Sequence, residues 1–184
     1  MKTKLLLLLL LANFSIYAQY TAIPDINFEK KLITKGIDSG TPDGQVLTSA
    51  ISGVQSLDVS NSLIVDLTGI QAFTALTTLK CDDNALTSVN ISSNLALKDI
   101  SFVNTKITSI NLSSNINLER AIFIRTPLAS IDVSANLNLT ELNISPGGFT
   151  EGLDGPGNIT SLDLSHNPKL KILNCSYHKI TIWT

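Results

Sequence analysis

The sequence predicts a repeat solenoid, in which short parallel strands from coils of 21 residues stack behind a helical N-terminal segment. Three observations support this fold class. The phrase ITSINLSSN at 107–115 has near-copies at 86–94, 128–136 and 159–167. Within each copy, apolar residues alternate with Ser, Thr, Asn or Asp, as a strand with one inward face requires. Aromatic residues make up only 5% of the chain, so the core must rely on stacked aliphatic residues.

The first element is a signal peptide at 1–18. In MKTKLLLLLLLANFSIYAQ, two lysines precede an apolar run that is too short for a comfortable membrane span. We expect cleavage after Ala18, which leaves Gln19 as the first residue of the mature chain. No second long apolar run follows, so we expect a secreted protein without a membrane span. Its place would be extracellular or on the cell surface, with the periplasm as the alternative.

The second element is an N-terminal helical cap at 19–53. Pro24 and Asp25 mark the start of a helix, and Gly36 marks its end. A helix here would cover the first coil, as the terminal unit of a solenoid must. The segment DSGTPDG at 38–44 faintly resembles a calcium loop, but a turn built on Pro-Asp-Gly is the plainer interpretation. The apolar face of the helix would consist of Ile26, Phe28, Leu32 and Ile33.

The third element is the solenoid itself, about six coils at 54–184 with the repeat LxxLxCxxNxLxxLxLxxNxx. Each coil reads as two similar halves, so we expect an extended segment on both of its long sides. The final coil ends in mid-repeat, with Trp183 in an inward column. One column of inward asparagines should hydrogen-bond to backbone groups of neighbouring coils that would otherwise be buried without partners. This column contains Asn94, Asn115, Asn136 and Asn167.

The opening YTAIPDINFEKK and the later stretch LDVSNSLIVDLTGIQAFTALTTLKC resemble secreted leucine-rich-repeat proteins of Bacteroidetes-type bacteria, which are described as internalin-like. The resemblance runs from about Tyr20 to the end of the chain. It implies an extracellular or surface protein that binds or adheres, and a repeat region without enzymatic activity. Such proteins often continue into further repeats or a C-terminal sorting domain, whereas this sequence stops at Thr184. Two interpretations follow: a truncated fragment, or an uncapped last coil that associates end to end with another copy.

A binding surface is expected on the outward side of the first-half strands, because these strands line the main sheet of leucine-rich repeats. Most outward residues there are small or polar. The exception is the coil RAIFIR at 120–125, where two outward isoleucines stand between two arginines. Exposed apolar residues ringed by arginine are typical of a protein-contact site, although isoleucine also simply favours strands. The candidate ligand-binding residues are Val103, Arg120, Ile122, Ile124, Arg125 and Tyr177.

A second candidate is the Gly- and Pro-rich insertion SPGGFTEGLDGPGN at 145–158, which interrupts the repeat. Insertions in solenoids form surface loops, often near the binding face. A decayed half-repeat is the alternative interpretation. Two apolar side chains of the insertion could hold it against the coil or could contact a ligand. Its candidate residues are Phe149, Glu151, Leu153 and Asp154.

No residues point to catalysis, a cofactor or a metal. Cys81 and Cys175 share an inward column about 20 Å apart, too far for a disulfide, and we expect both to be buried thiols. The spacing CSYH brings His178 near Cys175, but one such pair makes no zinc site, and His178 should instead occupy a ladder position. No nucleophile-elbow, zinc-protease or phosphate-loop motif occurs.

The charge of the chain argues against a further class of partner. The formal net charge is −2, and removal of Lys2 and Lys4 with the signal peptide changes it to −4. Nucleic-acid binding requires a basic face, so we expect no nucleic-acid partner. The sequence therefore predicts a non-catalytic binding or adhesion module whose partner is a protein or a surface polysaccharide. The alternatives are a structural spacer of a larger surface protein whose C-terminal part is missing, or a carbohydrate-binding accessory module, for which Tyr177 is the one good aromatic candidate on the sheet.

Overall fold

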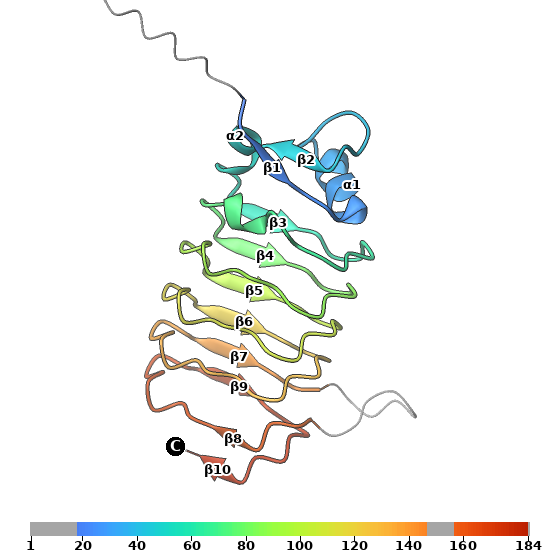
Figure 1. Ribbon diagram of the computed structural model, residues 1–184. Coiled ribbons are helices and arrows are strands. Elements are labelled where there is room, and N and C mark those ends of the chain that lie inside the picture. Colours follow the sequence, from blue (N-terminus) through green and yellow to red (C-terminus); the bar gives the residue numbers. More distant parts are fainter. Residues whose placement is uncertain (1–17, 147–156, 184) are drawn as a thin grey trace, which may run out of the picture.

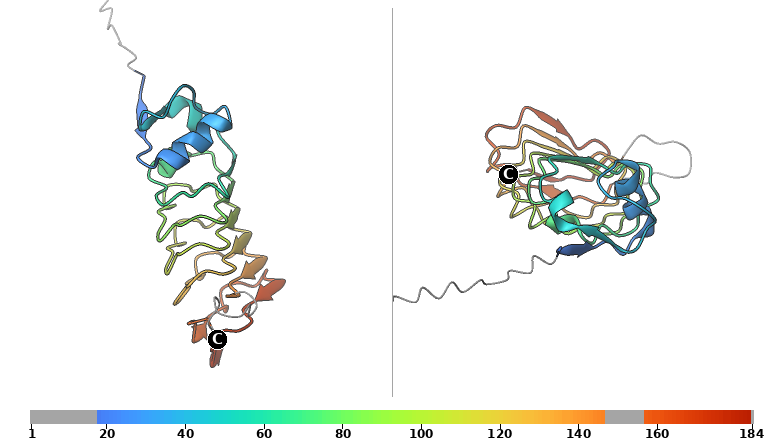
Figure 2. Two further views of the ribbon diagram at one scale, coloured as in Figure 1. Left: turned by 90° about the vertical axis from the view of Figure 1, so that its right-hand side faces the viewer. Right: turned by 90° about the horizontal axis from the view of Figure 1, so that it is seen from above.

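The computed structural model describes residues 18–146 and 157–183. Figures 1 and 2 show an elongated stack of coils with a helical segment at its N-terminal end. Residues 1–17 of the expected signal peptide and 147–156 of the insertion lie outside the described residues, as does the side chain of Trp183. No helix in the described ranges has the length and apolar character needed to span a membrane.

Six short strands within the described residues form one parallel sheet along the stack (Figure 1). Their order in space follows their order in the chain, and β9 lies next to β7 because β8 (Ser161–Leu162) belongs to a second, two-stranded sheet with β10 (Ile182–Trp183). This arrangement confirms the predicted solenoid of short parallel strands. The main sheet consists of β3 (Ser56–Asp58), β4 (Thr78–Lys80), β5 (Asp99–Ser101), β6 (Arg120–Ile122), β7 (Glu141–Asn143) and β9 (Ile172–Asn174).

Neighbouring strands of the main sheet pair without slippage, which places equivalent residues of the repeat side by side. The middle residues of β4 and β5 are register partners, and the pairing continues in the same register to β9. The middle residue of each strand from β3 to β7 points inward and is fully buried. Since a slip by one residue would expose this whole column, the period of the sequence fixes the register. The inward column consists of Leu57, Leu79, Ile100, Ala121 and Leu142.

The second long side of the coils differs from the sequence expectation. Strands occur there in β8 and β10, but none is present in the described coils that follow β4, β5 and β6, so the expectation of extended segments on both sides is wrong for these coils. Each of them turns at an Asn/Asp-x-Ser triplet. The Ser92 N–H donates to Asn90 Oδ1 at 3.1 Å, and the Ser113 N–H donates to Asn111 Oδ1 at 3.0 Å. The same contact follows strands elsewhere, since the Ser165 N–H donates to Asp163 Oδ1 after β8 and the Ser176 N–H donates to Asn174 Oδ1 after β9. The bend therefore does not distinguish the coils that form strands from those that do not.

The predicted asparagine column is confirmed as a ladder of buried hydrogen bonds. Asn115 is fully buried, and its Nδ2 donates to the carbonyl oxygens of Ile91 and Asn94, both at 3.0 Å. Asn136 repeats this pattern one coil later, with Leu112 and Asn115 as acceptors. Each side chain therefore satisfies the bend of the preceding coil and links two coils together. The Oδ1 atoms that are buried without a hydrogen-bond partner among the described residues belong to Asn94, Asn115, Asn136 and Asn167.

The N-terminal segment contains more than the expected helix. Helix α1 (Ile26–Thr34) is accompanied by an antiparallel pair, β1 (Tyr20–Ala22) and β2 (Gln45–Leu47). A short helix, α2 (Thr48–Ile51), follows β2, and one 3-10 turn, η1 (Ile70–Ala72), lies in the first coil. Figure 2 shows these elements gathered over one end of the stack, opposite the C-terminal coil. The segment therefore covers the first coil with both helix and sheet.

Helix α1 begins and packs as its sequence predicts, with one exception. Asp25 is its N-cap, and Oδ1 accepts the N–H groups of Asn27 at 2.8 Å and Phe28 at 3.1 Å. Phe28 is buried and stacks on Phe73 of the first coil, with ring centroids 6.2 Å apart. Ile26 is 54% exposed, so its expected place on the apolar face is wrong. It precedes Phe28 by two positions, which places it about 200° around the helix from the buried side.

The loop at 38–44 is a turn, and the buried Glu29 of α1 holds it in place. The Glu29 carboxylate accepts the N–H of Asp43 at 2.6 Å and the N–H of Gly44 at 2.9 Å. Gly40 and Gly44 have positive φ angles, which glycine adopts without strain. In the described part of the chain, no group of three His, Cys, Asp or Glu side chains could hold a metal ion. The Glu29 carboxylate therefore holds the loop against α1.

Gly69 determines how closely the N-terminal segment approaches the first coil. Its φ angle is 102°, a conformation that residues with a side chain rarely adopt. A Cβ atom at this residue would lie 2.5 Å from the carbonyl oxygen of Ala22 in β1. Backbone at such a distance cannot move aside cheaply, so β1 can pack here only against glycine.

Candidate functional site

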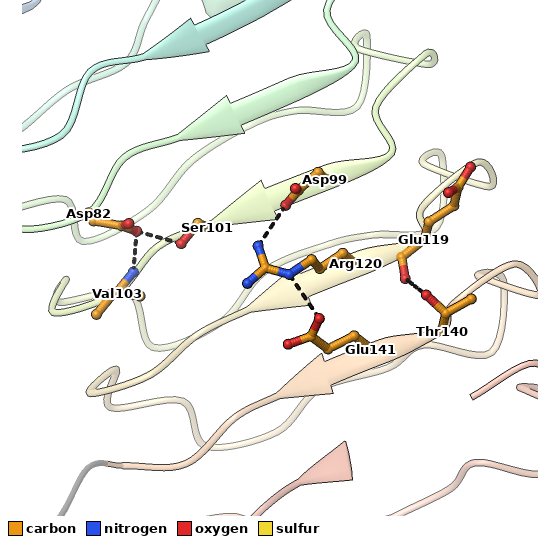
Figure 3. A network of polar contacts seen from close by, with 8 residues as sticks. All are labelled: Asp82, Asp99, Ser101, Val103, Glu119, Arg120, Thr140 and Glu141. Carbon is orange, nitrogen blue, oxygen red and sulfur yellow. Dashed lines mark hydrogen bonds and ion pairs between the residues drawn. The ribbon is translucent and has the colours of Figure 1, made fainter. Parts of the chain in front are cut away.

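Arg120 on β6 joins three strands instead of projecting freely from the sheet (Figure 3). Its Nε lies 2.9 Å from Glu141 Oε2 on β7, and its Nη1 lies 3.2 Å from Asp99 Oδ1 on β5. Partial burial lowers the pKa of the Arg120 guanidinium, but the hydrogen bond to Glu141 and the charge of Asp99 outweigh this and raise the pKa above its ordinary value. Arg120 therefore holds the sheet together, which weakens its candidacy as a contact residue.

Ile122 is the second sequence candidate that the structure corrects. Its side chain is only 3% exposed, so the expectation of two exposed isoleucines is wrong for this residue. It lies in register between Ser101 on β5 and Asn143 on β7, and it is not a member of the continuous hydrophobic core. Its side chain is therefore not available to a partner. Val103 and Ile124 are half-buried and remain on the surface in part.

Asp82 orders the ends of the strands beside the Arg120 network. Its Oδ1 accepts the Ser101 hydroxyl at 2.6 Å and the Val103 N–H at 2.8 Å (Figure 3). Before the strands begin, the Thr140 hydroxyl donates to the Glu119 carbonyl oxygen at 2.8 Å, which joins the next two coils. These outward polar groups are satisfied within the sheet, so the face is rigid before any partner arrives.

The residue four positions after each inward strand residue forms a feature that the sequence reasoning missed. In five coils this residue has a positive φ angle, between 52° and 66°. Asn and Asp adopt this left-handed conformation more readily than other residues with side chains, and their recurrence at one place in the repeat is the signal that could have revealed it. We call this line the left-handed edge; within the described residues it consists of Asn61, Asp83, Asn104, Arg125 and Tyr177. In the coil of β7 the equivalent residue is Pro146, whose ring forbids a positive φ angle, and the insertion begins there.

The left-handed edge also holds the two stems of the insertion. The Arg125 N–H donates to the Ser145 carbonyl oxygen at 3.0 Å, just before the insertion leaves the coil. The Gly157 N–H donates to the Tyr177 carbonyl oxygen at 3.0 Å, just after it returns. Three features that the sequence proposed separately, namely Arg125, the insertion and Tyr177, therefore meet at one edge. The insertion residues Phe149, Glu151, Leu153 and Asp154 lie outside the described residues.

His178 completes the attachment of the stems and confirms its predicted ladder position. Its Nε2 lies 2.6 Å from the Ile144 carbonyl oxygen, and its Nδ1 accepts the Ile159 N–H at 3.3 Å. These two contacts require the neutral ring with the proton on Nε2. The imidazole fills the space beside Gly157, where any side chain would collide with it. His178 is therefore a structural bridge between the two sides of the insertion.

Both cysteines are free, as their spacing predicts. Cys81 is fully buried, and burial raises the pKa of its thiol well above the ordinary value. A buried, protonated thiol is inert, so Cys81 is no candidate nucleophile. Cys175 is only partly buried, so the expectation of two buried thiols is wrong for this residue. It lies in the last described coil, where the preceding coil covers it from one side.

No protein-family model and no curated protein matches this chain. Solved structures do match. The functional domain of InlJ from Listeria monocytogenes, which includes a cysteine ladder, gives a TM-score of 0.72 at 28% identity, over 86% of this chain and 33% of that chain. Internalin InlF from the same species gives a TM-score of 0.62 at 17% identity, over 88% of this chain and 56% of the InlF chain. Internalin C2 from Listeria monocytogenes gives a TM-score of 0.51 at 19% identity, over 91% of this chain and 98% of the internalin C2 chain.

These likenesses confirm an internalin-like leucine-rich-repeat fold. The chain spans about a third of the InlJ chain and just over half of the InlF chain. In this protein the column that contains Cys81 and Cys175 holds Phe102, Phe123 and Ile144 between them. The two phenylalanine rings stack with centroids 5.8 Å apart, so aromatic packing fills this part of the column.

Proposed function

We propose that this chain is a non-catalytic binding module that presents the C-terminal half of its left-handed edge, together with the adjoining face of β6, to a protein partner. The likeness to the InlJ domain supports a binding or adhesive role. The signal peptide expected at 1–18 supports secretion to the outside of the cell or its surface, with the periplasm as the alternative. Recovery of the processed chain from the culture medium or from the periplasmic fraction would decide between these places.

The observation that carries this proposal is the presence of Arg125 and Tyr177 in left-handed backbone positions. Both side chains are exposed, and Tyr177 is 53% exposed. A long or bulky side chain in this conformation costs about 1 kcal/mol or more relative to a better-suited residue. The coil of Asn104 shows that the repeat accommodates the easier residue at the same place. Strained residues beside the stems of an insertion favour a role in recognition, and Arg and Tyr are the types that dominate protein contacts.

The mechanism is rigid display. The asparagine ladder and the Arg120 network fix neighbouring coils before a partner arrives, so side chains on the edge lose little freedom on binding. Half-buried Val103 and Ile124 lie on the adjoining face and offer apolar surface beside the edge. Binding would therefore rely on a few anchors on a preformed surface.

A capture experiment with immobilised residues 19–184 tests the proposal. Extracellular proteins and a panel of glycans are offered to the wild type and to an Arg125→Asn/Tyr177→Asn variant. Asparagine suits the left-handed conformation, so this variant should fold at least as well as the wild type. A Ser88→Ala/Ser109→Ala variant on the second long side, where both serines are exposed, is the matched control. We expect a protein that the wild type and the control retain and that the edge variant loses.

Retention of the same proteins by all three forms would refute the edge as the binding surface. If only glycans are captured and Tyr177 alone is needed, the carbohydrate-binding accessory role replaces the proposal. Capture of nothing would favour the spacer role. A further contact, with a second copy of the chain, is supported by Leu173, an inward residue that is 37% exposed, and sedimentation at rising concentration would reveal it.

A further inference from the structure

Three exposed cations gather at the bend that contains the left-handed edge. They are Lys106, Arg125 and Lys179, and none of them forms an ion pair with any described residue. Elsewhere in the repeat, Lys98 lies 2.9 Å from Glu119 and Arg120 is held by two carboxylates, whereas Lys80, Lys169 and Lys171 form no ion pair with a described residue. Unpaired cations at one bend of a chain whose mature net charge is −4 form a local exception to its overall charge.

The register of the coils places these cations at the same bend, in two neighbouring columns of the repeat. Lys106 follows Asn104 of the left-handed edge by two residues, and Lys179 follows Tyr177 by two residues. Arg125 belongs to the edge itself and lies between them in the stack. From the spacing of strands in a sheet, each coil adds about 5 Å, so the three charges extend over about 15 Å.

The same edge is acidic in the coil that precedes Asn104. Asp83 occupies the edge position one coil before Asn104, and Asp82 stands beside it. The Asn104 Nδ2 donates to Asp83 Oδ1 at 2.8 Å, so the change from acidic to basic occurs between these two coils. The edge is therefore divided, with carboxylates toward the N-terminal segment and unpaired cations toward the insertion stems.

We propose that the basic half of the edge docks an acidic segment of a partner protein; this inference rests on the binding role proposed above. An acidic segment would pair with the three cations, and Arg125 could bind a carboxylate through two parallel hydrogen bonds. The exposed Tyr177 ring beside Lys179 adds the apolar contact area that protein contacts use. The cations are separated by one coil and then by two, which fits a protein segment better than a polysaccharide with one charge at a constant repeat.

Fluorescence anisotropy with fluorescein-labelled hexaglutamate and the chain 19–184 tests this inference. The edge variant is Lys106→Gln/Arg125→Asn/Lys179→Gln. Its charge-matched control is Lys30→Gln/Lys35→Gln/Lys171→Gln, which removes three exposed cations away from the edge. We expect the edge variant to bind about tenfold more weakly than the wild type at low salt, and the control to stay close to the wild type. Binding of the wild type should weaken as salt rises to about 0.15 M.

Equal weakening in the edge variant and in the control would overturn the inference, because it would assign binding to overall charge. Absence of hexaglutamate binding by the wild type at low salt would overturn it as well. Tighter binding of an oligogalacturonate of the same charge would overturn the choice of a protein partner. The wild type could capture a protein that the Arg125→Asn/Tyr177→Asn variant loses, and yet fail to bind hexaglutamate. This result would refute the acidic segment and leave the proposed binding function standing.

Discussion

The same inward column is fully buried at the N-terminal end of the solenoid and partly exposed in its last described coil. At the N-terminal end Leu57 is fully buried, with the helices and strands of the N-terminal segment beyond it. In the last described coil Leu173, its equivalent, is 37% exposed, and Cys175 is only partly buried. The register is the same at both ends. The difference teaches that an inward leucine of a repeat stabilises the protein only as far as its neighbours cover it.

The ends also differ in their polar contacts. Asp25 joins α1 to the first coil, because its Oδ2 accepts the N–H of Val65 at 2.7 Å and of Asp66 at 2.9 Å while Oδ1 caps the helix. At the other end His178 joins two segments through single contacts of its two ring nitrogens. A carboxylate with four donors binds its surroundings more strongly than a neutral ring with two partners. The N-terminal end should therefore be the more stable one.

The largest expected effect comes from truncating one inward leucine in each setting. Leu57→Ala removes a fully buried side chain at the N-terminal end, so we expect the free energy of unfolding to fall by about 3–4 kcal/mol. Leu173→Ala removes a side chain that is already 37% exposed, so we expect a loss of about 1 kcal/mol. Urea denaturation of residues 19–184, followed by circular dichroism, measures both changes.

Equal losses in these two variants would contradict the comparison. They would indicate that the last described coil is covered in solution, as end-to-end association would cover it. Sedimentation velocity at rising protein concentration separates that case from a monomer. Unchanged denaturant dependence in both variants serves as the control that the unfolded states are comparable.

A smaller effect is expected at the polar contact of the N-terminal end. Asp25→Asn replaces a charged acceptor of four backbone N–H groups with a neutral amide, so we expect a loss of about 2–3 kcal/mol near neutral pH. Asp43→Asn is the matched control, because Asp43 is exposed and its carboxylate accepts, among the described residues, only the N–H of Gln45. Chemical denaturation of both variants measures the difference in the free energy of unfolding. Similar losses would show that Asp25 stabilises the fold no more than an exposed aspartate does.

The pH dependence of the same variant sharpens this prediction. Burial raises the pKa of the Asp25 carboxyl, but hydrogen bonds from the N–H groups of Val65, Asp66, Phe28 and Asn27 outweigh it and leave the pKa below its ordinary value. The carboxylate therefore stabilises the fold fully above the unfolded-state pKa of about 3.9, and this contribution is lost as the pH falls through the lower folded-state pKa. The difference in the free energy of unfolding between wild type and Asp25→Asn should shrink from pH 7 to pH 3. A constant difference would contradict the stabilising role assigned to the Asp25 carboxylate.

The smallest expected effect concerns the left-handed edge, where stability and function should oppose each other. Arg125→Asn places a better-suited residue at a φ angle of 57°, so we expect the free energy of unfolding to rise by about 0.5–1 kcal/mol. Asn61→Arg makes the reverse exchange in the first coil, at a φ angle of 52°, and should lower it by a similar amount. Thermal denaturation of the two variants checks both signs. Changes of the same sign would show that the backbone conformation is not what distinguishes these residues.

Much of the fold can be read from the sequence, because a repeat imposes its period on every coil. The spacing of ITSINLSSN identifies the inward leucines and isoleucines, and the recurring asparagine identifies the ladder. Asp25 before an apolar periodic stretch marks the start of α1. The apolar pattern predicts extended segments on both long sides, whereas the structure forms strands on the second side only in β8 and β10, and nothing in the pattern of one coil marks that difference.

The candidate site was less accessible to sequence reasoning. Arg120, Ile122 and Arg125 are close in sequence and equally plausible as outward residues. In the structure, Arg120 lies between two carboxylates, Ile122 is buried, and Arg125 is exposed beside the insertion stems. Nothing in the letters of one coil distinguishes these outcomes, because each depends on the residues that the two neighbouring coils place alongside.

The sequence by itself therefore determined the period, the register, the inward columns and the residues that satisfy buried backbone groups, since each of these repeats from coil to coil and follows from local geometry. Only the tertiary structure decided which outward residues are free for a partner. It brought Arg125, Tyr177 and both stems of the insertion to one edge, although Arg125 and Tyr177 are far apart in the sequence. Exposure and charge pairing on an outer face depend on contacts between coils, and one repeat unit does not contain them.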